Sequence, residues 1–279
     1  MNPIFQHWRK LLATLLAAVL VFASLATSRL TAGPAEDEGC GSWREDIELD
    51  GILGEYVDIL SWNIQKTSND GWQLDLARHG AGVHLAFLQE AALDAPLVET
   101  LDSTSHKSFA AGYTTASQAT GVMTLSRGAP SISCNYQTLE PWLGTPKATG
   151  VTYHPVAGQE HPLLAVNLHA VNFAMGVKEY RDQINTIKSL VASHPGAIIV
   201  AGDLNTWSEQ RQRVVDEFMA EHGLEPVTFI PDLRTRFFGR ALDHVYIRGL
   251  AAEEAEVIEV DSSDHNPLRM RLRFSEWTD

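Results

Sequence analysis

The stretch A-I-I-V-A-G-D-L-N-T-W, residues 197–207, joins an apolar run directly to a glycine, a carboxylate and an amide. The apolar part has the composition of a buried strand. Asp203 and Asn205 are two positions apart, so both side chains would point to the same face if the strand continued through them. Gly, Asp and Asn are also common in turns, and this stretch taken alone favours a plain turn. The rest of the chain decides between the two interpretations.

Other segments have the same form, in which an apolar, strand-like run ends in a polar side chain. Single cases have ordinary explanations, since a lone histidine in apolar sequence is usually a core residue. Sheets bring strand ends together, however, so one convergent site is the simplest explanation for the whole set. We call these side chains the polar terminators: Asn63, Glu90, His169, Asp203, Asn205, Asp243, Asp264 and His265.

The polar terminators are carboxylates, amides and imidazoles, with no cysteine among them. Oxygen ligands of this kind suit a hard cation such as Mg²⁺ or Mn²⁺, which needs only one or two carboxylates besides water and substrate oxygens. The histidines are then free for proton transfer and hydrogen bonding. This combination indicates metal-assisted hydrolysis of a phosphoester.

Helix-like segments alternate with the strand-like runs. Val177, Tyr180, Ile184, Ile187 and Val191 repeat at three- and four-residue steps, which predicts one helix before the strand at residue 197. Thr206 and Glu209 form a capping-box pattern that predicts a second helix ending at Gly223. The 279 residues are 44% hydrophobic and contain no internal repeat, so we expect one large α/β domain.

The N-terminus differs from the rest of the chain. Arg9 and Lys10 precede an uncharged run rich in Leu, Ala and Val, as in an export signal. We therefore assign residues 1–28 to a signal peptide or an uncleaved membrane anchor, residues 29–54 to an acidic linker and residues 55–279 to the domain. In either case the protein is exported, with its domain outside the cytoplasm: periplasmic or secreted if the signal is cleaved, membrane-anchored if it is not.

The chain has two cysteines, Cys40 and Cys134. An oxidising compartment permits one bridge between them, which would add roughly 4 to 5 kcal/mol to the free energy of unfolding in the chain-entropy model. The alternative is two unrelated thiols.

The net charge of −14 counts against tight, non-specific binding of nucleic acid. Local cations still allow a phosphate-binding rim made of arginine forks, with aromatic rings that stack on a base. The candidates are Arg234, Arg236, Arg240 and Trp207, with Phe237 and Phe238 beside them and Arg211 and Arg213 as a second cluster. The alternative is that these arginines pair with surface carboxylates and the phenylalanines belong to the core.

Six motifs follow one another in the chain: S-W-N-I-Q-K (61–66), L-Q-E (88–90), N-L-H-A-V-N-F (167–173), G-D-L-N (202–205), L-D-H-V (242–245) and S-D-H-N-P (263–267). In this order they resemble the endonuclease/exonuclease/phosphatase superfamily, the DNase I-like and exonuclease III-like proteins, and within it the bacterial YafD-like branch. The resemblance implies a four-layer α/β sandwich, in which two facing, mostly antiparallel sheets are flanked by helices.

The resemblance also implies roles for the polar terminators. Asn63 and Glu90 would hold the metal, with Asp264 as a further ligand, and Asp203 and Asn205 would position and deprotonate water. His169 and His265, the latter oriented by Asp243, would stabilise the phosphoryl oxygens. Either Asp203 or the His265–Asp243 pair would be the general base.

The function expected from the resemblance is a metal-dependent phosphodiesterase of the nuclease type, in which water attacks in line. Alternatives are a phosphomonoesterase or lipid phosphodiesterase on the same fold, or a binding module without catalysis. We expect a monomer acting on a phosphate ester, with nucleic acid as one candidate. Degeneration to a binding module is disfavoured, because a chain released from catalysis has no reason to retain the full set of terminators.

Overall fold

The computed structural model describes Cys40 and residues 51–101, 104, 106–141, 143–174 and 176–275. The predicted export segment and most of the predicted linker lie outside these residues. Within the described part of the chain, no helix combines the length and the apolar character needed to cross a membrane.

The first of two six-stranded sheets has the strand order β13-β14-β1-β2-β4-β3. Its β1–β2 pair is parallel and every other neighbouring pair is antiparallel. The strands are β1 (Tyr56–Asn63), β2 (Leu85–Ala92), β3 (His106–Thr114), β4 (Ala119–Ser126), β13 (Leu250–Val257) and β14 (Leu268–Phe274).

The second sheet has the order β5-β6-β7-β8-β12-β9, with only β7–β8 parallel. A short hairpin, β10 (Arg236–Phe237) and β11 (Arg240–Ala241), stands apart from both sheets. The strands are β5 (Ile132–Leu139), β6 (Pro146–His154), β7 (Leu163–His169), β8 (Ile198–Asp203), β9 (Glu225–Pro226) and β12 (Asp243–Arg248).

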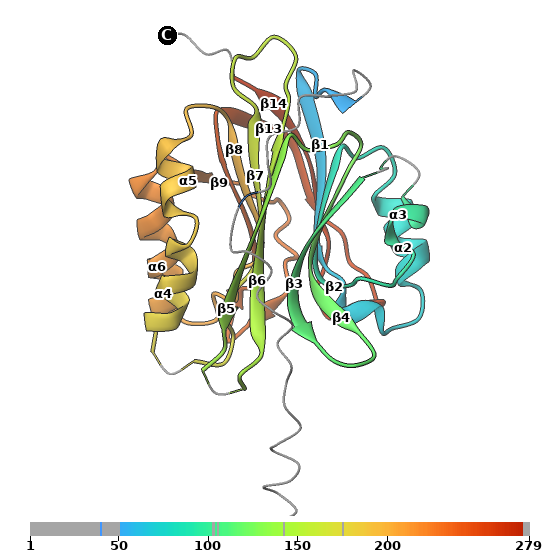
Figure 1. The fold of residues 1–279 in the computed structure, drawn as a ribbon, viewed down its shortest axis with the longest axis vertical. Helices are drawn as coiled ribbons and strands as arrows, with labels where there is room; N and C mark the ends of the chain where they lie inside the picture. Colours follow the sequence, from blue (N-terminus) through green and yellow to red (C-terminus); the bar gives the residue numbers. More distant parts are fainter. Residues whose placement is uncertain are drawn as a thin grey trace, which may run out of the picture. The chain divides into compact units, whose positions relative to one another are not determined.

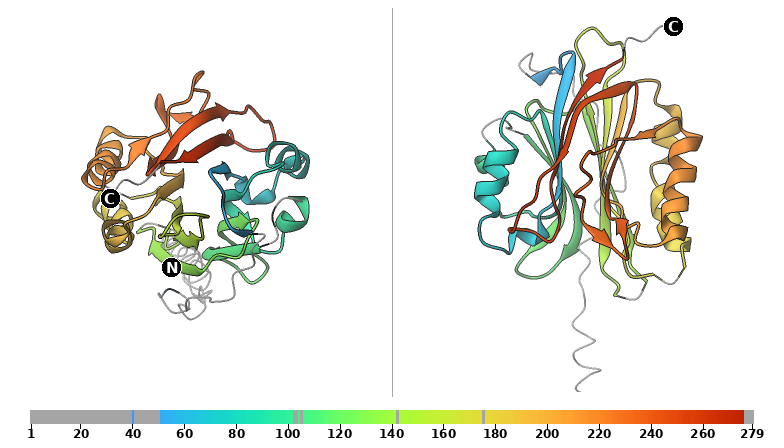
Figure 2. Two further views of the ribbon diagram at one scale, coloured as in Figure 1. Left: turned by 90° about the horizontal axis from the view of Figure 1, so that it is seen from above. Right: turned by 180° about the vertical axis from the view of Figure 1, so that it is seen from behind.

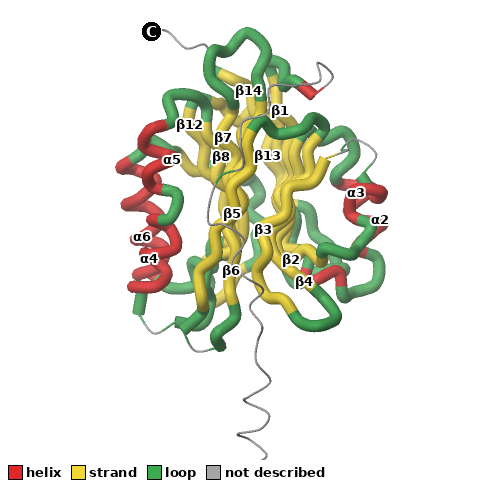
Figure 3. The backbone as a smooth tube through the Cα atoms, in the orientation of Figure 1, coloured by secondary structure: helices red, strands yellow, loops and turns green. Residues whose placement is uncertain are grey.

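The two sheets face each other, and the helices lie on their outer faces (Figure 1). Figure 3 shows the same four layers, with strands in the middle and helices on both flanks. The predicted four-layer α/β sandwich is therefore confirmed. The first sheet is covered by α2 (Trp72–His79) and α3 (Leu97–Thr100), with the short 3₁₀ helix η2 (Gln65–Thr67) after β1; the second is covered by α4 (Lys178–Asn185), α5 (Lys188–Ser193) and α6 (Glu209–Glu221).

Burial on both faces explains why the central strands are continuous apolar runs rather than alternating ones. In β1, Val57 and Ile59 pack in the core between the sheets, whereas Leu60 and Trp62 pack with α2. All six residues of β8 are buried. The core between the sheets also includes Leu53, whose backbone bonds to Pro155 and Ala157, so the chain joins the core before β1 begins.

Some predicted elements differ from the observed ones. The helix expected from Val177 to Val191 is two helices, because the chain leaves α4 at Thr186, whose hydroxyl donates to the carbonyl of Gln183 at 2.7 Å. Ser208, rather than Thr206, caps α6 by accepting a hydrogen bond from the backbone N–H of Arg211. The last two strands form a hairpin whose first strand runs from Leu250 to Val257.

A disulfide joins Cys40 to Cys134 of β5, across 94 positions of sequence. The alternative of two unrelated thiols is therefore wrong. Cys134 is fully buried and Cys40 is exposed, so the bridge fastens the segment before the domain to the edge strand of the second sheet.

Candidate active site

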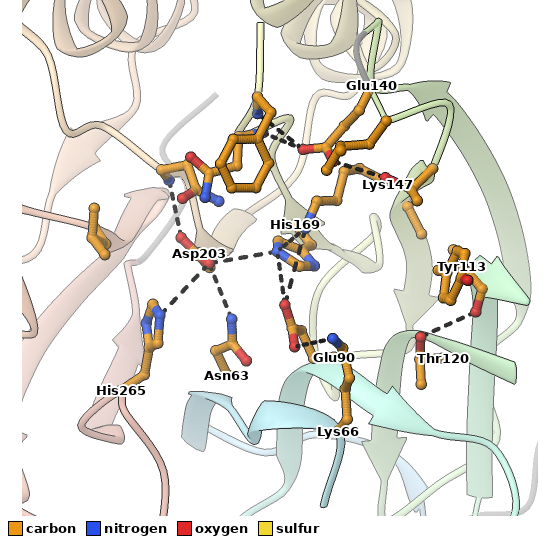
Figure 4. Close-up of a pocket in the computed structure, with 18 of the residues that line it drawn as sticks. Asn63, Lys66, Glu90, Tyr113, Thr120, Glu140, Lys147, His169, Asp203 and His265 are labelled. Carbon is orange, nitrogen blue, oxygen red and sulfur yellow. Dashed lines mark hydrogen bonds and ion pairs between the residues drawn. The ribbon is translucent and has the colours of Figure 1, made fainter. Parts of the chain in front are cut away.

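A cavity of about 550 Å³ is lined by residues from both sheets and by the loops that follow their strands. Figure 4 shows Asp203, His169, Glu90, Asn63 and His265 pointing toward one another in this pocket. The structure thus brings the polar terminators together. Seven of them line the cavity, and Asp243 lies behind His265: the seven are Asn63, Glu90, His169, Asp203, Asn205, Asp264 and His265.

Strand register explains the convergence. Asp203 ends β8, and it is flanked on one side by His169 at the end of β7 and on the other by Asp243 at the start of β12. Neighbouring positions in a sheet are about 5 Å apart, so the three side chains share one edge. The loop after β13 adds His265, whose carbonyl accepts a hydrogen bond from the indole of Trp62 at 2.8 Å.

Asp203 and Asn205 reach the pocket by a different route from the predicted one. The strand ends at Asp203, and Asn205 has a left-handed backbone with φ of 48°. The N–H of Asn205 donates to Oδ1 of Asp203 at 3.0 Å, as in an Asx turn. The stretch is therefore a turn at a strand end, and this turn itself holds both side chains in the site.

His265 lies between two carboxylates. Its Nδ1–H donates to Oδ2 of Asp243 at 2.8 Å, and its Nε2 is 3.9 Å from Oδ2 of Asp203. Burial alone would lower the pKa of His265, but the two carboxylates outweigh burial and raise it to about 10. Burial raises the pKa of Asp203 to about 6, although His265 opposes that rise. At neutral pH the site therefore pairs an imidazolium with an ionised Asp203.

The pKa of His169 is shifted in the opposite direction from that of His265. Its ring is buried, and burial together with the nearby Lys147 ammonium holds its pKa well below the usual range. Lys147 Nζ lies 2.8 Å from Nε2 of His169 and donates to it. The proton of the neutral ring is then on Nδ1. His169 meets the pocket as a neutral imidazole next to a fixed positive charge.

Glu90 faces these positive groups without a close partner. Its carboxylate oxygens lie 3.7 Å from His169 Nε2, 4.0 Å from Lys147 Nζ and 3.9 Å from Lys66 Nζ. The backbone at Glu90 is left-handed, with φ of 51°, where the pairing of β2 with β4 is interrupted. Such a conformation is uncommon for a residue other than glycine, and it turns the side chain out of the strand into the pocket.

Two groups of side chains are candidates for a metal. One oxygen or nitrogen each from Asp203, Asp243 and His265 lie within 4.8 Å of one another. That group is already joined by a hydrogen bond, and a protonated His265 has no lone pair to offer. The second group is the predicted one, Asn63, Glu90 and Asp264.

The predicted group fits a hard cation better. In the described part of the chain, no hydrogen bond reaches the carboxylate of Glu90, so both of its oxygens are available. The amide of Asn63 donates to Asp203 Oδ2 at 3.0 Å, which leaves its carbonyl oxygen with one partner, the N–H of Gln65 at 3.1 Å. Asp264 is exposed at the pocket wall. Oxygen donors of this kind match Mg²⁺ or Mn²⁺.

Only the aromatic members of the predicted phosphate-binding rim reach the pocket. Trp207 lines the pocket, as do Phe237 and Phe238, whereas none of the predicted arginines does. Arg234 and Arg236 both pair with Asp232, at 2.8 and 2.5 Å. In the second cluster, Arg211 is buried and hydrogen-bonded to the carbonyls of residues 171, 172 and 205, and Arg213 pairs with Glu209 at 2.8 Å.

Sequence reasoning missed three charged residues of the pocket: Lys66, Lys147 and Glu140. Lys147 is the second residue of β6, at a position where a lysine is ordinarily solvated, and Lys66 is the last residue of the S-W-N-I-Q-K motif. Glu140 is buried and accepts hydrogen bonds from the backbone N–H groups of Asn172 and Phe173 at 2.6 and 3.2 Å. The only sequence signal for Glu140 was an acidic residue at the end of a strand-like run.

Comparisons with known proteins identify the family of the chain. A family model described as the endonuclease/exonuclease/phosphatase family matches residues 60–265. The chain is 42% identical over 229 residues to a UPF0294 protein of Vibrio vulnificus strain YJ016, covering 81% of this chain and 79% of the relative. It is 39% identical over 223 residues to a UPF0294 protein of Klebsiella pneumoniae strain 342, covering 77% and 81%.

Solved structures share the fold. An endonuclease/exonuclease/phosphatase from Beutenbergia cavernae superposes with a TM-score of 0.64 at 16% identity, covering 79% of this chain and 72% of that one. TDP2 from C. elegans superposes with a TM-score of 0.54 at 15% identity, covering 78% and 75%. The family match covers most of the domain and includes the first five motifs and the S-D-H of the sixth. The chain belongs to the endonuclease/exonuclease/phosphatase family.

Proposed function

We propose that the protein is a divalent-metal-dependent hydrolase of phosphodiesters. The observation that carries this proposal is the convergence in one pocket of an ionised Asp203, an imidazolium at His265 and the carboxylate of Glu90, to which no described residue donates a hydrogen bond. A base, a cation for developing negative charge and a metal ligand are the groups that hydrolysis of a phosphoester needs.

Different side chains of the pocket supply the base, the positive charge and the metal ligands. Asp203 accepts a proton from the attacking water, and Asn205 holds the carboxylate of Asp203 through its backbone N–H. The high pKa of His265 makes it a donor to phosphoryl oxygens rather than a base, with Asp243 fixing the orientation of its ring. His169 lies beside Asp203 on the side away from Asp243, and the Lys147 ammonium next to it offers a second positive charge to the phosphoryl group. Mg²⁺ or Mn²⁺, held by Glu90, Asn63 and Asp264, would supply Lewis-acid stabilisation of the phosphoryl charge.

The test is a screen of DNA, RNA, sphingomyelin, inositol phosphates and bis(p-nitrophenyl) phosphate with Mg²⁺ or Mn²⁺ and with EDTA. We expect metal-dependent release of product from at least one diester. His265→Ala should lower the rate by roughly 10²- to 10⁴-fold, the usual range for a positioned acid–base group. Absence of turnover on every substrate would leave the binding module as the better interpretation, and preference for inositol phosphates would favour a phosphomonoesterase.

We also propose that the domain works outside the cytoplasm, which is supported by the export-like residues 1–28 and by the Cys40–Cys134 disulfide. We propose further that it is a monomer. Expressed with its own N-terminus, the protein should fractionate with the periplasm, the medium or the membrane. N-terminal sequencing should begin near Thr27 if the segment is cleaved. Recovery from the cytoplasm with Met1 intact would contradict export, and light scattering would test the monomer.

A further inference from the structure

The mouth of the pocket is unusually apolar. Ten large hydrophobic side chains are exposed in the described part of the chain, and five of them line this one cavity. They come from separate loops and strands, so a local sequence bias does not explain the grouping. We call these five the apolar rim: Tyr113, Leu143, Phe173, Phe237 and Phe238, exposed by 38, 54, 56, 53 and 79%.

The tip of the β10–β11 hairpin carries the most exposed member of the rim. Phe237 pairs with Arg240, so Phe238 and Gly239 form a two-residue turn, and both have positive φ, 49° and 78°. Asn or Asp followed by Gly is the usual choice for such a turn. A phenylalanine in the left-handed region costs conformational energy, and it gains no burial here in return. A function at the surface would account for its presence.

The opposite side of the rim is held rigidly. Glu140 is buried and accepts from the N–H of Phe173, and it also accepts from the hydroxyl of Thr145 at 2.8 Å, in the loop that carries Leu143. One buried carboxylate therefore fixes both loops. Groups held in place while exposed are prepared for a contact, because less conformational entropy is lost when they bind.

The charges of the pocket do not suit a polyanion. Its lining includes four carboxylates, Glu90, Glu140, Asp203 and Asp264, but only two lysines. No arginine lines it, and Arg234 and Arg236 are held by Asp232. These charges are sufficient to bind one phosphate next to a metal ion. The flanking phosphates of a nucleic acid would find few free cations.

The N-terminus favours a membrane as the occupant of the rim. Only 12 positions separate Ser28, the end of the apolar N-terminal run, from Cys40. A chain of that length spans at most about 40 Å, and the disulfide fastens its end to β5, the strand that leads to Glu140. If the apolar run stays in a bilayer, this short connection keeps the domain close to that membrane.

We propose that the apolar rim docks on a lipid bilayer and that the substrate is a phospholipid whose headgroup phosphodiester enters the pocket. This assignment rests on the proposed hydrolase function and narrows its substrate to a lipid phosphodiester. In this arrangement the aromatic side chains at the tip of the β10–β11 hairpin lie in the interfacial region of the bilayer, and the phosphate of one lipid headgroup enters the pocket. Apolar insertion rather than charge drives the contact, because the protein carries a net charge of −14.

Docking can be measured without turnover. Both native cysteines are in the disulfide, so a single introduced cysteine can be labelled under non-reducing conditions with an environment-sensitive fluorophore. Phe238→Cys and Phe173→Cys, in the full chain, should show a blue shift and brighter emission with phosphatidylcholine vesicles. The matched control is Leu74→Cys on α2, which is 72% exposed but outside the pocket. An unchanged emission at 238 and 173, an equal change at 74, or a response to single-stranded DNA instead of vesicles would overturn the proposal.

Turnover then tests the substrate. The double variant Phe237→Ser/Phe238→Ser should lower the ratio of phospholipid hydrolysis in vesicles to bis(p-nitrophenyl) phosphate hydrolysis by roughly tenfold, because interfacial binding scales with buried apolar area. Leu74→Ser should leave this ratio unchanged. An unchanged ratio in the double variant would refute the lipid assignment. Docking of labelled Phe238→Cys without hydrolysis of any ester would instead refute the hydrolase function and retain the docking surface.

Phe238→Asn gives a further readout. Asparagine tolerates the left-handed backbone at this turn, so the variant should unfold at a higher temperature than the wild type while hydrolysing vesicle phospholipid more slowly. A phenylalanine kept for packing would produce the reverse, a lower unfolding temperature. A lower unfolding temperature would show that Phe238 stabilises the turn, and the conformation of the hairpin would then no longer support the docking surface.

Discussion

Glu90 illustrates how one side chain links the backbone to the proposed chemistry. An irregularity in β2 turns it into the pocket, where three nitrogen groups lie 3.7 to 4.0 Å from its oxygens. These distances are longer than hydrogen bonds, so the carboxylate is surrounded by positive or neutral nitrogen groups without being committed to any of them. It is the strongest candidate for a metal ligand in the described part of the chain.

We therefore expect Glu90→Gln to lower the affinity for Mg²⁺ by at least about tenfold while leaving the fold intact, because a neutral amide compensates less of the cation's charge. Calorimetric titration with Mg²⁺ measures the affinity without any substrate, and circular dichroism checks the fold. Glu99→Gln on α3, away from the pocket, is the matched control. Wild-type affinity in Glu90→Gln would assign the metal to other ligands.

Lys147 is a second residue whose role depends on its neighbours. Its ammonium donates to His169 at 2.8 Å, lies 4.0 Å from Glu90, and has only 16% of its side chain exposed. A fixed cation at this point can stabilise charge on a phosphoryl group.

Replacing this lysine should lower kcat by roughly 10²-fold, the scale of one preorganised electrostatic contact. Lys147→Met removes the charge and retains the stem, and Lys147→Arg should restore part of the rate. Lys107→Met, on an exposed position of β3, is the control for loss of a charge elsewhere. Steady-state kinetics on the best diester from the screen would show this, and an equal kcat in Lys147→Met would exclude the contact.

At the scale of elements, each central strand has two buried faces and one polar end. β6 ends at His154, which is buried and paired with the hydroxyl of Thr152 at 2.9 Å. Burial lowers the pKa of His154 to about 3, so this ring stays neutral in the folded protein at pH values where the unfolded chain is protonated.

The sign of the pH dependence follows. Between its unfolded pKa of about 6.5 and its folded pKa of about 3, the unfolded state binds one proton more, so stability falls as the pH falls, by about 1.4 kcal/mol per pH unit. His154→Gln should lack this loss of stability at low pH. Its free energy of unfolding should therefore approach or exceed the wild-type value near pH 4. Urea titrations at pH 7, 5.5 and 4 measure it, with His161→Gln as the exposed control. Parallel pH profiles for wild type and His154→Gln would contradict the assignment.

The whole domain is closed by long-range links. The two sheets are joined at the centre by Gln89 of β2, whose amide donates to Asn167 of β7 at 2.8 Å with both side chains fully buried. The disulfide links Cys40 to an edge strand 94 positions later. Such a link restricts the unfolded chain over more than a third of its length.

Loss of the disulfide should lower the free energy of unfolding by roughly 4 to 5 kcal/mol, since its loop is about 95 residues long. Cys40→Ser is the preferred variant, because Cys40 is exposed and Cys134 is buried. Urea unfolding of Cys40→Ser, and of the wild type with and without dithiothreitol, measures the effect, and non-reducing peptide mapping confirms the bond. Equal midpoints in all three samples would show that the link contributes no stability.

The residue pattern alone predicted the polar terminators, and the resemblance of the six motifs to a known family predicted the sandwich. Apolar runs longer than an alternating strand, interrupted by Asn63, Glu90, His169 and Asp203, are visible without any coordinates, because burial on both faces of a strand leaves a continuous apolar pattern. The edge strands β3 and β5 were not predicted, because their apolar patterns are weaker. β3 and β5 contain small and polar residues such as Ser108, Gly112, Asn135 and Gln137, so neither presents a continuous apolar run.

Side-chain partnerships were decided only by the tertiary structure. The prediction of an arginine rim rested on closeness in sequence to catalytic motifs, but Asp232 binds Arg234 and Arg236 and directs them away from the pocket lining. Lys147 and Glu140, by contrast, reach the pocket because β6 lies beside β7 in the sheet and β5 lies beside β6. Figure 2 shows β13 and β14 from behind, beside strands more than a hundred positions earlier in the chain. Which charges meet depends on such long-range pairing, and no local pattern of residues encodes it.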